Sequence, residues 1–328
     1  MPHAFLQIRD LSIAFPTEDG PVDAVSGLDL EVGRGEIVGL VGESGSGKSL
    51  TSLAVMGLVA RPGRVRTGSI LLGDRDVVAM APKELRRMRG KTVSMVFQEP
   101  LTALNPSISI GRQLTDTIRA HRAVSSAEAR RIAVKALDEV GIRDAERRLS
   151  AYPHEFSGGM RQRALIAMAI SCEPQLLIAD EPTTALDVTV QAQIMQLLRR
   201  LRDERGLSIL LISHNLHLVA EMCDRVVVMY AGRVVEAGTA EQVFVRPHHP
   251  YSRLLHECVP TLERRGRPTN IPGAAPRPGE VRAGCAFAPR CPKATEICTK
   301  ETPLLAGRGG HVAACWHPET VGEDVPAC

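Results

Sequence analysis

The stretch Gly42-Glu43-Ser44-Gly45-Ser46-Gly47-Lys48-Ser49 follows the short apolar run 36–41 and precedes a helical pattern over 50–56. Between a strand and a helix, the pattern G-x-x-x-x-G-K-[ST] is typical of a nucleotide phosphate site. The glycines let backbone N–H groups close around phosphate oxygens, and the helix N-terminus adds its own unpaired N–H groups. We therefore predict that Gly42–Leu50 bind the phosphates, with Lys48 on the β- and γ-phosphates and Ser49 on Mg²⁺.

The composition is that of an ordinary α/β protein. The chain has 328 residues, 44 % hydrophobic and 23 % charged, which is enough for one large or two modest domains. A net charge of +3, with basic residues scattered among acidic ones, argues against a nucleic-acid partner. No apolar run approaches the roughly 18 residues that span a bilayer, and the N-terminus does not resemble a signal peptide. We expect a cytoplasmic location, with the eight cysteines as thiols or metal ligands rather than disulfides.

Polar residues follow three further apolar runs that are typical of buried strands. Residues 92–97 end at Gln98, residues 175–179 end at Asp180-Glu181, and residues 207–212 are followed by Ser213-His214. Ligands of open α/β sheets bind at the carboxyl ends of the strands, so we expect these side chains to converge near the phosphates. There Gln98 would bind Mg²⁺ or orient a water, Asp180 would position Mg²⁺, and Glu181 would act as a base. Taken alone, Gln98 is more typical of a solvated loop and His214 of a structural position.

The remaining pattern predicts a sheet with an inserted helical part. Residues 5–15 predict an edge strand, 22–32 a second strand, 61–68 a loop and 69–73 a short strand. From 101 to 152 the character is helical, with a capped start near Ser125, which predicts a helical subdomain between two strands of the core sheet. Phe15 fits either stacking on a base or packing in the core. Ser157-Gly158-Gly159 precede a helix and fit either an anion site or a simple helix cap.

In this order, the motifs resemble those of an ATP-binding-cassette (ABC) ATPase over residues 1 to about 250. The motifs that carry the resemblance are Gly42–Ser49, Gln98, Ser157-Gly158-Gly159, Asp180-Glu181, Ala185-Leu186-Asp187 and His214. The usual signature Leu-Ser-Gly-Gly-Gln is altered at its ends to Phe156 and Met160, which leaves Ser-Gly-Gly intact. The resemblance implies an α/β fold, an ABC-type P-loop NTPase with a RecA-like core, an antiparallel β subdomain and an inserted helical subdomain.

Three further stretches narrow the resemblance to the ATPase subunits of bacterial dipeptide and oligopeptide permeases: 98–106, 152–156 and 249–255. This implies a nucleotide-binding domain over 1–250, with its helical subdomain at about 99–170, and a C-terminal extension over 251–328. It also implies ATP-driven import of peptides, on the cytoplasmic face of the inner membrane. The implied partners are a second related ATPase, two membrane subunits and an extracytoplasmic peptide-binding protein. The alternatives are a related nickel or glutathione importer and a soluble ABC ATPase of DNA repair or translation.

The resemblance also implies a role for each matching residue. Glu181 would polarise the attacking water, His214 would contact the γ-phosphate, and Asp180 would orient Mg²⁺ held by Ser49 and Gln98. Two cassettes would pack head to tail, so that Ser157, Gly158 and Gly159 of one hold the ATP on the phosphate loop of the other, with Asp187 facing the partner cassette. Phe15 would take the adenine-stacking position, where Tyr is commoner.

Four cysteines close to the C-terminus predict a metal site. Cys285, Cys291, Cys298 and Cys315 are separated by 5, 6 and 16 residues and follow a Pro-, Gly- and Arg-rich linker over 264–282. No C-x-x-C pair is present, which argues against an ordinary zinc ribbon. A [4Fe–4S] cluster fits four thiolates, and related peptide-permease ATPases have a similar tail. Zinc and unliganded thiols are the alternatives, and His311 or His317 are possible substitute ligands that are more typical of a solvated surface.

Overall fold

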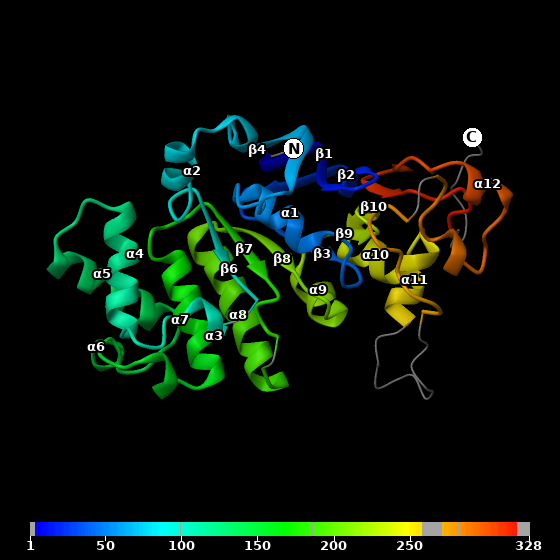
Figure 1. The fold of residues 1–328 in the computed structure, drawn as a ribbon. Coiled ribbons are helices and arrows are strands. Elements are labelled where there is room, and N and C mark those ends of the chain that lie inside the picture. Colours follow the sequence, from blue (N-terminus) through cyan, green and yellow to red (C-terminus); the bar gives the residue numbers. More distant parts are fainter. Residues whose placement is uncertain (1–3, 99, 185, 258–270, 281–282, 320–328) are drawn as a thin grey trace. The chain divides into compact units, whose positions relative to one another are not determined.

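The computed structural model describes residues 4–98, 100–184, 186–257, 271–280 and 283–319 (Figure 1). The chain forms two compact units, each assembled from segments that are distant in the sequence. The first unit is built mainly from residues 32–36 and 72–212, and the second from residues 6–31, 37–71 and 213–328. The chain therefore passes several times between the two units.

The first unit contains three parallel strands, β6 (Val93–Val96), β7 (Leu176–Asp180) and β8 (Ser208–Ile212). β7 lies between the other two, with Val93 opposite Leu176 and Leu176 opposite Ser208. Every residue of β7 and β8 is buried. A parallel strand is covered on both faces, which is why these segments are almost continuously apolar. The strands predicted at 92–97, 175–181 and 207–212 are thus confirmed within one or two residues.

Most of the remaining elements of the first unit are helices, as the sequence predicts for residues 101–152. Their bounds are α2 (Pro82–Met88), α3 (Pro100–Ala103), α4 (Ile110–His121), α5 (Ser126–Glu139), α6 (Ala145–Arg148), α7 (Gly158–Ile170) and α8 (Val188–Arg205), and the short elements β5 (Arg75–Asp76), η1 (Val77–Ala79) and η2 (Pro153–Glu155) accompany them. The predicted start near Ser125 is confirmed, because its side chain accepts a hydrogen bond from the Glu128 N–H. Ala129, Ala133 and Ala136 are buried along one face of α5, as its period requires.

The second unit contains a sheet in which β1 (Ala4–Thr17) lies between β2 (Gly20–Gly33) and β4 (Arg64–Leu72). The prediction that residues 5–15 form an edge strand is therefore wrong. The loop predicted at 61–68 is also too long, because β4 begins at Arg64. Both errors have the same cause: β4 is mostly polar and contains Gly68, so its pairing with a distant strand leaves no periodic signal in the sequence.

The other sheet of the second unit is extended by the C-terminal part of the chain. β3 (Ile37–Val41) pairs parallel with β9 (Arg225–Tyr230), and β9 pairs antiparallel with β10 (Arg233–Thr239). β12 (His311–Ala313) then pairs with β10, and β11 (Ala306–Arg308) with β12, both antiparallel. The helices of this unit are α1 (Lys48–Val55), α9 (Leu216–Met222), α10 (Ala240–Val245), α11 (Pro250–Glu257), α12 (Glu296–Lys300) and the short η3 (Ala288–Arg290).

A buried carboxylate connects the C-terminal part to β10. Glu236 in β10 has no exposed surface and accepts hydrogen bonds from the backbone N–H groups of His248 and His249, at 2.7 and 2.9 Å. His311 Nε2 of β12 lies 2.7 Å from the same carboxylate, and its ring stacks on His248 at 3.8 Å. One side chain therefore holds both β12 and the segment that leads into α11. His311 is 5 % exposed, so its interpretation as a solvated surface residue is wrong.

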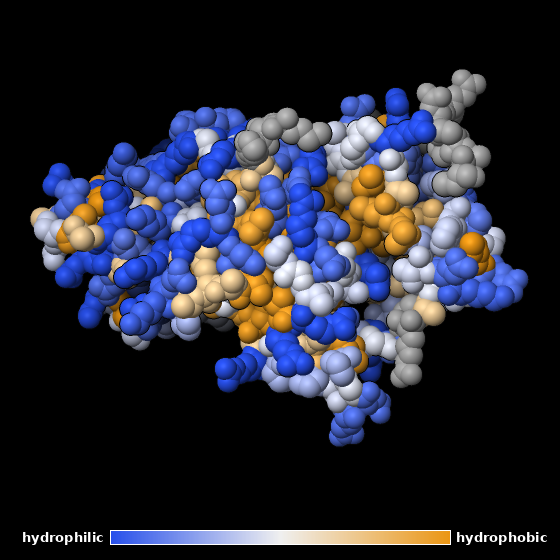
Figure 2. All heavy atoms as spheres, turned by 90° about the horizontal axis from the view of Figure 1, so that it is seen from above, coloured by the Kyte–Doolittle hydropathy of each residue, from blue (hydrophilic) through white to orange (hydrophobic). Residues whose placement is uncertain are grey.

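Hydrophilic residues dominate the face shown in Figure 2, with hydrophobic residues gathered between them. Leu304 and Leu305, which precede β11, are among the large apolar side chains that are exposed. Among the helices of the described residues, none is long and apolar enough to span a bilayer.

His249 makes the stability of this arrangement depend on pH. Burial lowers the pKa of His249 from 6.5 to about 4, and its Nδ1 accepts a hydrogen bond from the Tyr251 N–H. Between pH 6.5 and about 4 the imidazole of His249 is protonated in the unfolded chain and neutral in the folded chain. The contribution of His249 to the free energy of unfolding is therefore fully present above pH 6.5 and is lost as the pH falls towards about 4. The full loss corresponds to about 3 kcal/mol.

We predict that His249→Asn, which keeps an acceptor for the Tyr251 N–H, reduces this pH dependence. The urea midpoint of the wild type should fall more steeply than that of the variant as the pH is lowered through this window. The two proteins differ only at position 249, so the difference between their slopes reports the effect of the imidazole. Equal slopes would show that protonation of His249 does not oppose folding.

Candidate functional site

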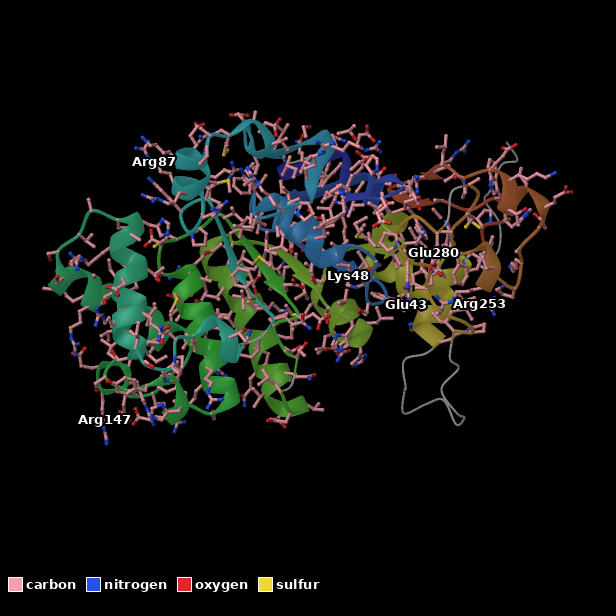
Figure 3. All side chains as sticks on the ribbon, viewed as in Figure 1. Glu43, Lys48, Arg87, Arg147, Arg253 and Glu280 are labelled. Atoms are coloured by element: carbon pink, nitrogen blue, oxygen red, sulfur yellow. The ribbon has the colours of Figure 1, made fainter. Side chains whose placement is uncertain are left out.

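The loop between β3 and α1 has the geometry of a phosphate-binding loop. Gly42 has φ 149°, and a Cβ at this position would lie 2.2 Å from the Met229 carbonyl oxygen of β9, so only glycine fits. Lys48 is the first residue of α1, and Figure 3 shows its position relative to Glu43 in the loop. Its Nζ donates to the carbonyls of Gly42 and Glu43, both at 2.9 Å. Ser49 is exposed beside it. The loop thus combines helix N–H groups, an ammonium group and a hydroxyl group, as the sequence predicts.

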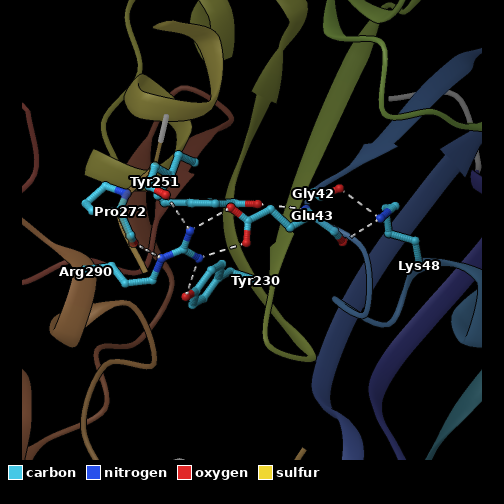
Figure 4. A network of polar contacts seen from close by, with 8 residues as sticks. Gly42, Glu43, Lys48, Tyr230, Tyr251, Pro272 and Arg290 are labelled. Carbon is cyan, nitrogen blue, oxygen red and sulfur yellow. Dashed lines mark hydrogen bonds and ion pairs between the residues drawn. The ribbon is translucent and has the colours of Figure 1, made fainter. Parts of the chain in front are cut away.

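Glu43, within this loop, is held by residues from the C-terminal part of the chain (Figure 4). Its backbone N–H donates to the hydroxyl group of Tyr251 in α11, at 2.8 Å. Its carboxylate forms a bidentate ion pair with Arg290, with N–O distances of 2.8 and 3.1 Å. The sequence does not predict this contact, because the two residues are 247 positions apart and no sequence motif relates them.

In the first unit, the ends of β6 and β7 bring Gln98 and Glu181 together. Gln98 follows β6 by two residues, and Asp180 is the last residue of β7. The Gln98 side-chain amide donates to Glu181 Oε2 at 2.9 Å, and the Thr184 hydroxyl donates to the same oxygen at 2.8 Å. Asp180 is 5 % exposed. Amide and carboxylate oxygens at the ends of adjacent parallel strands are suited to binding Mg²⁺ and positioning a water.

Glu181 has a strained backbone, which the sequence did not reveal. Its φ of 47° lies in the left-handed region, which residues other than glycine rarely adopt. Its N–H donates to the Ile212 carbonyl at the end of β8, at 2.8 Å, which supports this conformation. Conformations of this kind are enriched at functional sites, which agrees with the predicted role of Glu181.

The Ser-Gly-Gly motif lies at the start of α7. Ser157 is the N-cap, and its hydroxyl group accepts a hydrogen bond from the Met160 N–H at 3.3 Å. Gly158 and Gly159 form the first helical positions. Phe156, at the position where Leu is usual, is 2 % exposed, so the substitution preserves a buried apolar anchor. The same motif therefore caps α7 and forms its N-terminus, which is suited to binding an anion.

The other predicted nucleotide contacts have these local environments. Asp187 caps α8, with Oδ1 accepting from the Val190 N–H at 3.0 Å. His214 is exposed, two residues beyond β8. Phe15 is half-buried, and its ring lies so close to Gly63 that a Cβ there would be 2.6 Å from Cε1. Phe15 therefore packs against its own subdomain with one part of the ring.

The four C-terminal cysteines line one small cavity together with His249 and Phe287. Burial raises the pKa of the Cys285 and Cys291 thiols, and that of Cys315 to about 11. His311 is bonded to Glu236, and His317 Nε2 lies 2.7 Å from the Thr295 hydroxyl. Over the described part of the chain, no three His, Cys, Asp or Glu side chains form a group that could hold a metal ion. The four thiols therefore share one cavity, but within the described residues they do not form the predicted set of metal ligands.

Known proteins match both parts of the chain. Residues 25–184 match the family model of the ABC transporter, and residues 235–298 that of the oligopeptide/dipeptide transporter C-terminal region. The oligopeptide transport ATP-binding protein OppD of Salmonella typhimurium is 49 % identical over 96 % of this chain and 94 % of its own length. The protein AppD of Bacillus subtilis, with the same description, is 46 % identical over 97 % of this chain and 98 % of its own.

Solved structures agree with this match. A dimer of the ATP-binding cassette MJ0796 in a post-hydrolysis state with ADP and Pi has a TM-score of 0.63 and 26 % identity, covering 72 % of this chain and 98 % of that one. CbiO1 of Clostridium perfringens, part of an ABC transporter complex, has a TM-score of 0.65 and 28 % identity, covering 74 % and 91 %. The predicted fold class, an ABC cassette, is confirmed. The chain belongs to the ABC transporter ATPases, and within them to the family of oligopeptide and dipeptide transport ATP-binding proteins.

Proposed function

We propose that this ATPase energises the import of dipeptides and oligopeptides across the bacterial inner membrane. The observation that carries this proposal is the presence in one chain of the phosphate loop and of a C-terminal region matched at 235–298 by the peptide-transporter model. That region contains His248, His249 and Tyr251. Their contacts with Glu236 and Glu43 give the motif at 249–255 a structural role. A related nickel or glutathione importer is the alternative, because the ATPase subunit does not itself contact the cargo.

In the proposed mechanism, each residue acts on the nucleotide as its motif implies. Lys48 and the N–H groups of Gly42–Leu50 bind the phosphates. Ser49 and Gln98 would hold Mg²⁺ through their oxygens, and Asp180 would hold it through its water shell. When bound, the ion would neutralise charge on the phosphates. Glu181, oriented by Gln98 and Thr184, accepts the proton of the water that attacks the γ-phosphate. His214 contacts the γ-phosphate, and Phe15 stacks on the adenine with the part of its ring that is not covered by Gly63.

We infer that two cassettes enclose the nucleotide. Ser157, Gly158 and Gly159 of one cassette would bind the γ-phosphate of ATP on the other, and Asp187 would face the partner. MJ0796, which this chain resembles, forms a dimer bound to ADP and Pi, and this supports the pairing of two cassettes. The proposed partners are a second, related ATPase, two transmembrane subunits and an extracytoplasmic peptide-binding protein, with this chain on the cytoplasmic face of the inner membrane. Closure on ATP and opening after hydrolysis would then drive the membrane subunits.

We further propose a [4Fe–4S] cluster on Cys285, Cys291, Cys298 and Cys315, within a C-terminal extension at 251–328 that follows a nucleotide-binding domain at 1–250. The four thiols line the same cavity, and four thiolates are the usual ligands of such a cluster. A zinc ion is the alternative, and in both cases the thiols must lose protons that burial helps them to retain. Unliganded thiols are the third alternative.

The Glu181→Gln variant tests the mechanism and the function together. The amide cannot accept a proton, so ATP hydrolysis and import of a labelled tripeptide should fall by at least about 100-fold. Binding of ATP should be retained, because the phosphate loop is unchanged. The same substitution at the exposed Glu204 on α8 should change neither activity.

Undiminished hydrolysis in the Glu181→Gln variant would remove Glu181 from the mechanism. Import of nickel or glutathione, in place of the tripeptide, by cells with the wild-type protein would overturn the peptide assignment and leave the ATPase assignment intact.

Metal analysis of protein purified without oxygen tests the proposed cluster. We expect about four iron and four acid-labile sulfide per chain, lost on Cys291→Ser but not on Cys172→Ser, whose thiol is buried away from the cavity. Zinc in place of iron would establish the structural alternative. The absence of both would refute a metal site at these cysteines.

A further inference from the structure

Arg290 uses all of its hydrogen-bonding capacity at the phosphate loop and the segment beside it. Nη1 donates to Glu43 Oε2 and to the Tyr230 hydroxyl, at 2.8 and 3.1 Å. Nη2 donates to Glu43 Oε1 at 3.1 Å and to the Ile271 carbonyl at 3.4 Å, and Nε donates to the Pro272 carbonyl at 2.7 Å. A guanidinium has five N–H donors, and here five acceptors receive them. Such complete use fixes the plane of the group and the carboxylate opposite it.

An apolar wall of aromatic rings excludes water from one side of this ion pair. Tyr230 of β9 contacts Tyr251 of α11 at a centroid distance of 4.6 Å, and Phe287 lies 5.2 Å from Tyr230, edge to face. All three rings are less than 2 % exposed. The Arg290 guanidinium lies over Tyr230 and Phe287, at 5.8 and 5.9 Å. The Arg290 side chain is 7 % exposed and that of Glu43 is 25 % exposed, whereas the side chains of two surface ion pairs of this protein are 37 to 55 % exposed. Burial strengthens the attraction between the charges and makes their separation costly.

Hydrogen bonds hold Glu43 through its N–H, its carboxylate and its carbonyl oxygen, and so fix its conformation. Its N–H donates to Tyr251, its carboxylate binds Arg290, and its carbonyl oxygen accepts hydrogen bonds from Lys48 Nζ and from the Ser46 N–H, the latter at 3.2 Å. Lys48 and Ser46 belong to the phosphate loop itself. Glu43 therefore connects the groups proposed to bind phosphate to two residues, Tyr251 and Arg290, that lie outside the loop.

We propose that Arg290 is a positioning residue for ATP binding: by clamping Glu43 it holds the phosphate loop in its binding conformation. A loop held in advance does not have to be ordered when the nucleotide arrives, which improves affinity without a direct contact. The inference rests on the proposed role of Gly42–Leu50 in binding phosphates. It extends the nucleotide site to the C-terminal part of the chain, since Arg290 closes η3 and immediately precedes Cys291.

The test is a titration of full-length protein with ATP and Mg²⁺, combined with steady-state hydrolysis by the assembled transporter. For Arg290→Gln we expect the Kd and the KM for ATP to rise by about 5- to 30-fold, with kcat changed by no more than about twofold. Arg290→Lys should be intermediate, because an ammonium keeps the charge and loses the fork. A merely structural role would instead reduce the amount of active protein, which lowers kcat and the melting midpoint and leaves KM unchanged.

A double-mutant cycle identifies the partner through which Arg290 acts. If Arg290 acts through Glu43, then Arg290→Gln combined with Glu43→Gln should weaken ATP binding no more than the stronger single substitution. Independent, additive effects would overturn the proposed clamp. The matched control is Lys293→Gln, which removes an ion pair to Glu319 at 2.6 Å from the same region and should leave the Kd within about twofold of the wild type.

One further variant separates this inference from the proposed site itself. Lys48→Ala should abolish tight ATP binding whatever residue stands at 290. Normal ATP binding by Lys48→Ala would refute the phosphate loop as the site. Lost binding in Lys48→Ala together with unchanged KM in Arg290→Gln would refute only the positioning role.

Discussion

The buried carboxylate of Glu236 is the constraint on which the C-terminal architecture depends. A carboxylate without solvent exposure is stable only when its oxygens are bonded, and here two backbone N–H groups and His311 satisfy it. Those three donors come from two separate segments, so the charge fixes both of them against β10. One segment leads directly into α11 and Tyr251, and the other is β12. The polar group in the core therefore determines where the aromatic rings can pack.

The aromatic rings in turn bury Arg290 in its ion pair with Glu43 of the phosphate loop. Buried ion pairs contribute little net stability, because removing two charges from water offsets most of their attraction. Their contribution is geometric: once buried, Arg290 has few alternatives to the carboxylate of Glu43. The loop between β3 and α1 is thus held from the C-terminal part through Arg290 and Tyr251, and the Met229 carbonyl of β9 lies so close to Gly42 that it leaves no room for a side chain there.

The sequence predicted the features whose determinants are local. The phosphate loop, the strand ends at Gln98 and Asp180, and the cap at Ser125 follow from spacing, period and capping chemistry within about ten residues. The edge assignment of β1 and the loop at 61–68 were wrong because strand order depends on distant partners. The strained backbone of Glu181, the burial of His311 and the contact of Glu43 with Arg290 had no local signal. Each depends on a long-range contact that composition does not reveal.

Hydrogen–deuterium exchange of the backbone amides in residues 42–48 shows whether the C-terminal part of the chain orders the phosphate loop. It should be followed in the wild type and in Arg290→Gln, with and without ATP and Mg²⁺. We expect slow exchange in the nucleotide-free wild type, faster exchange in the variant, and protection by ATP in both proteins. Equal exchange in the two nucleotide-free proteins would contradict the support of the loop by the C-terminal part. A lack of protection by ATP in the wild type would contradict the nucleotide site itself.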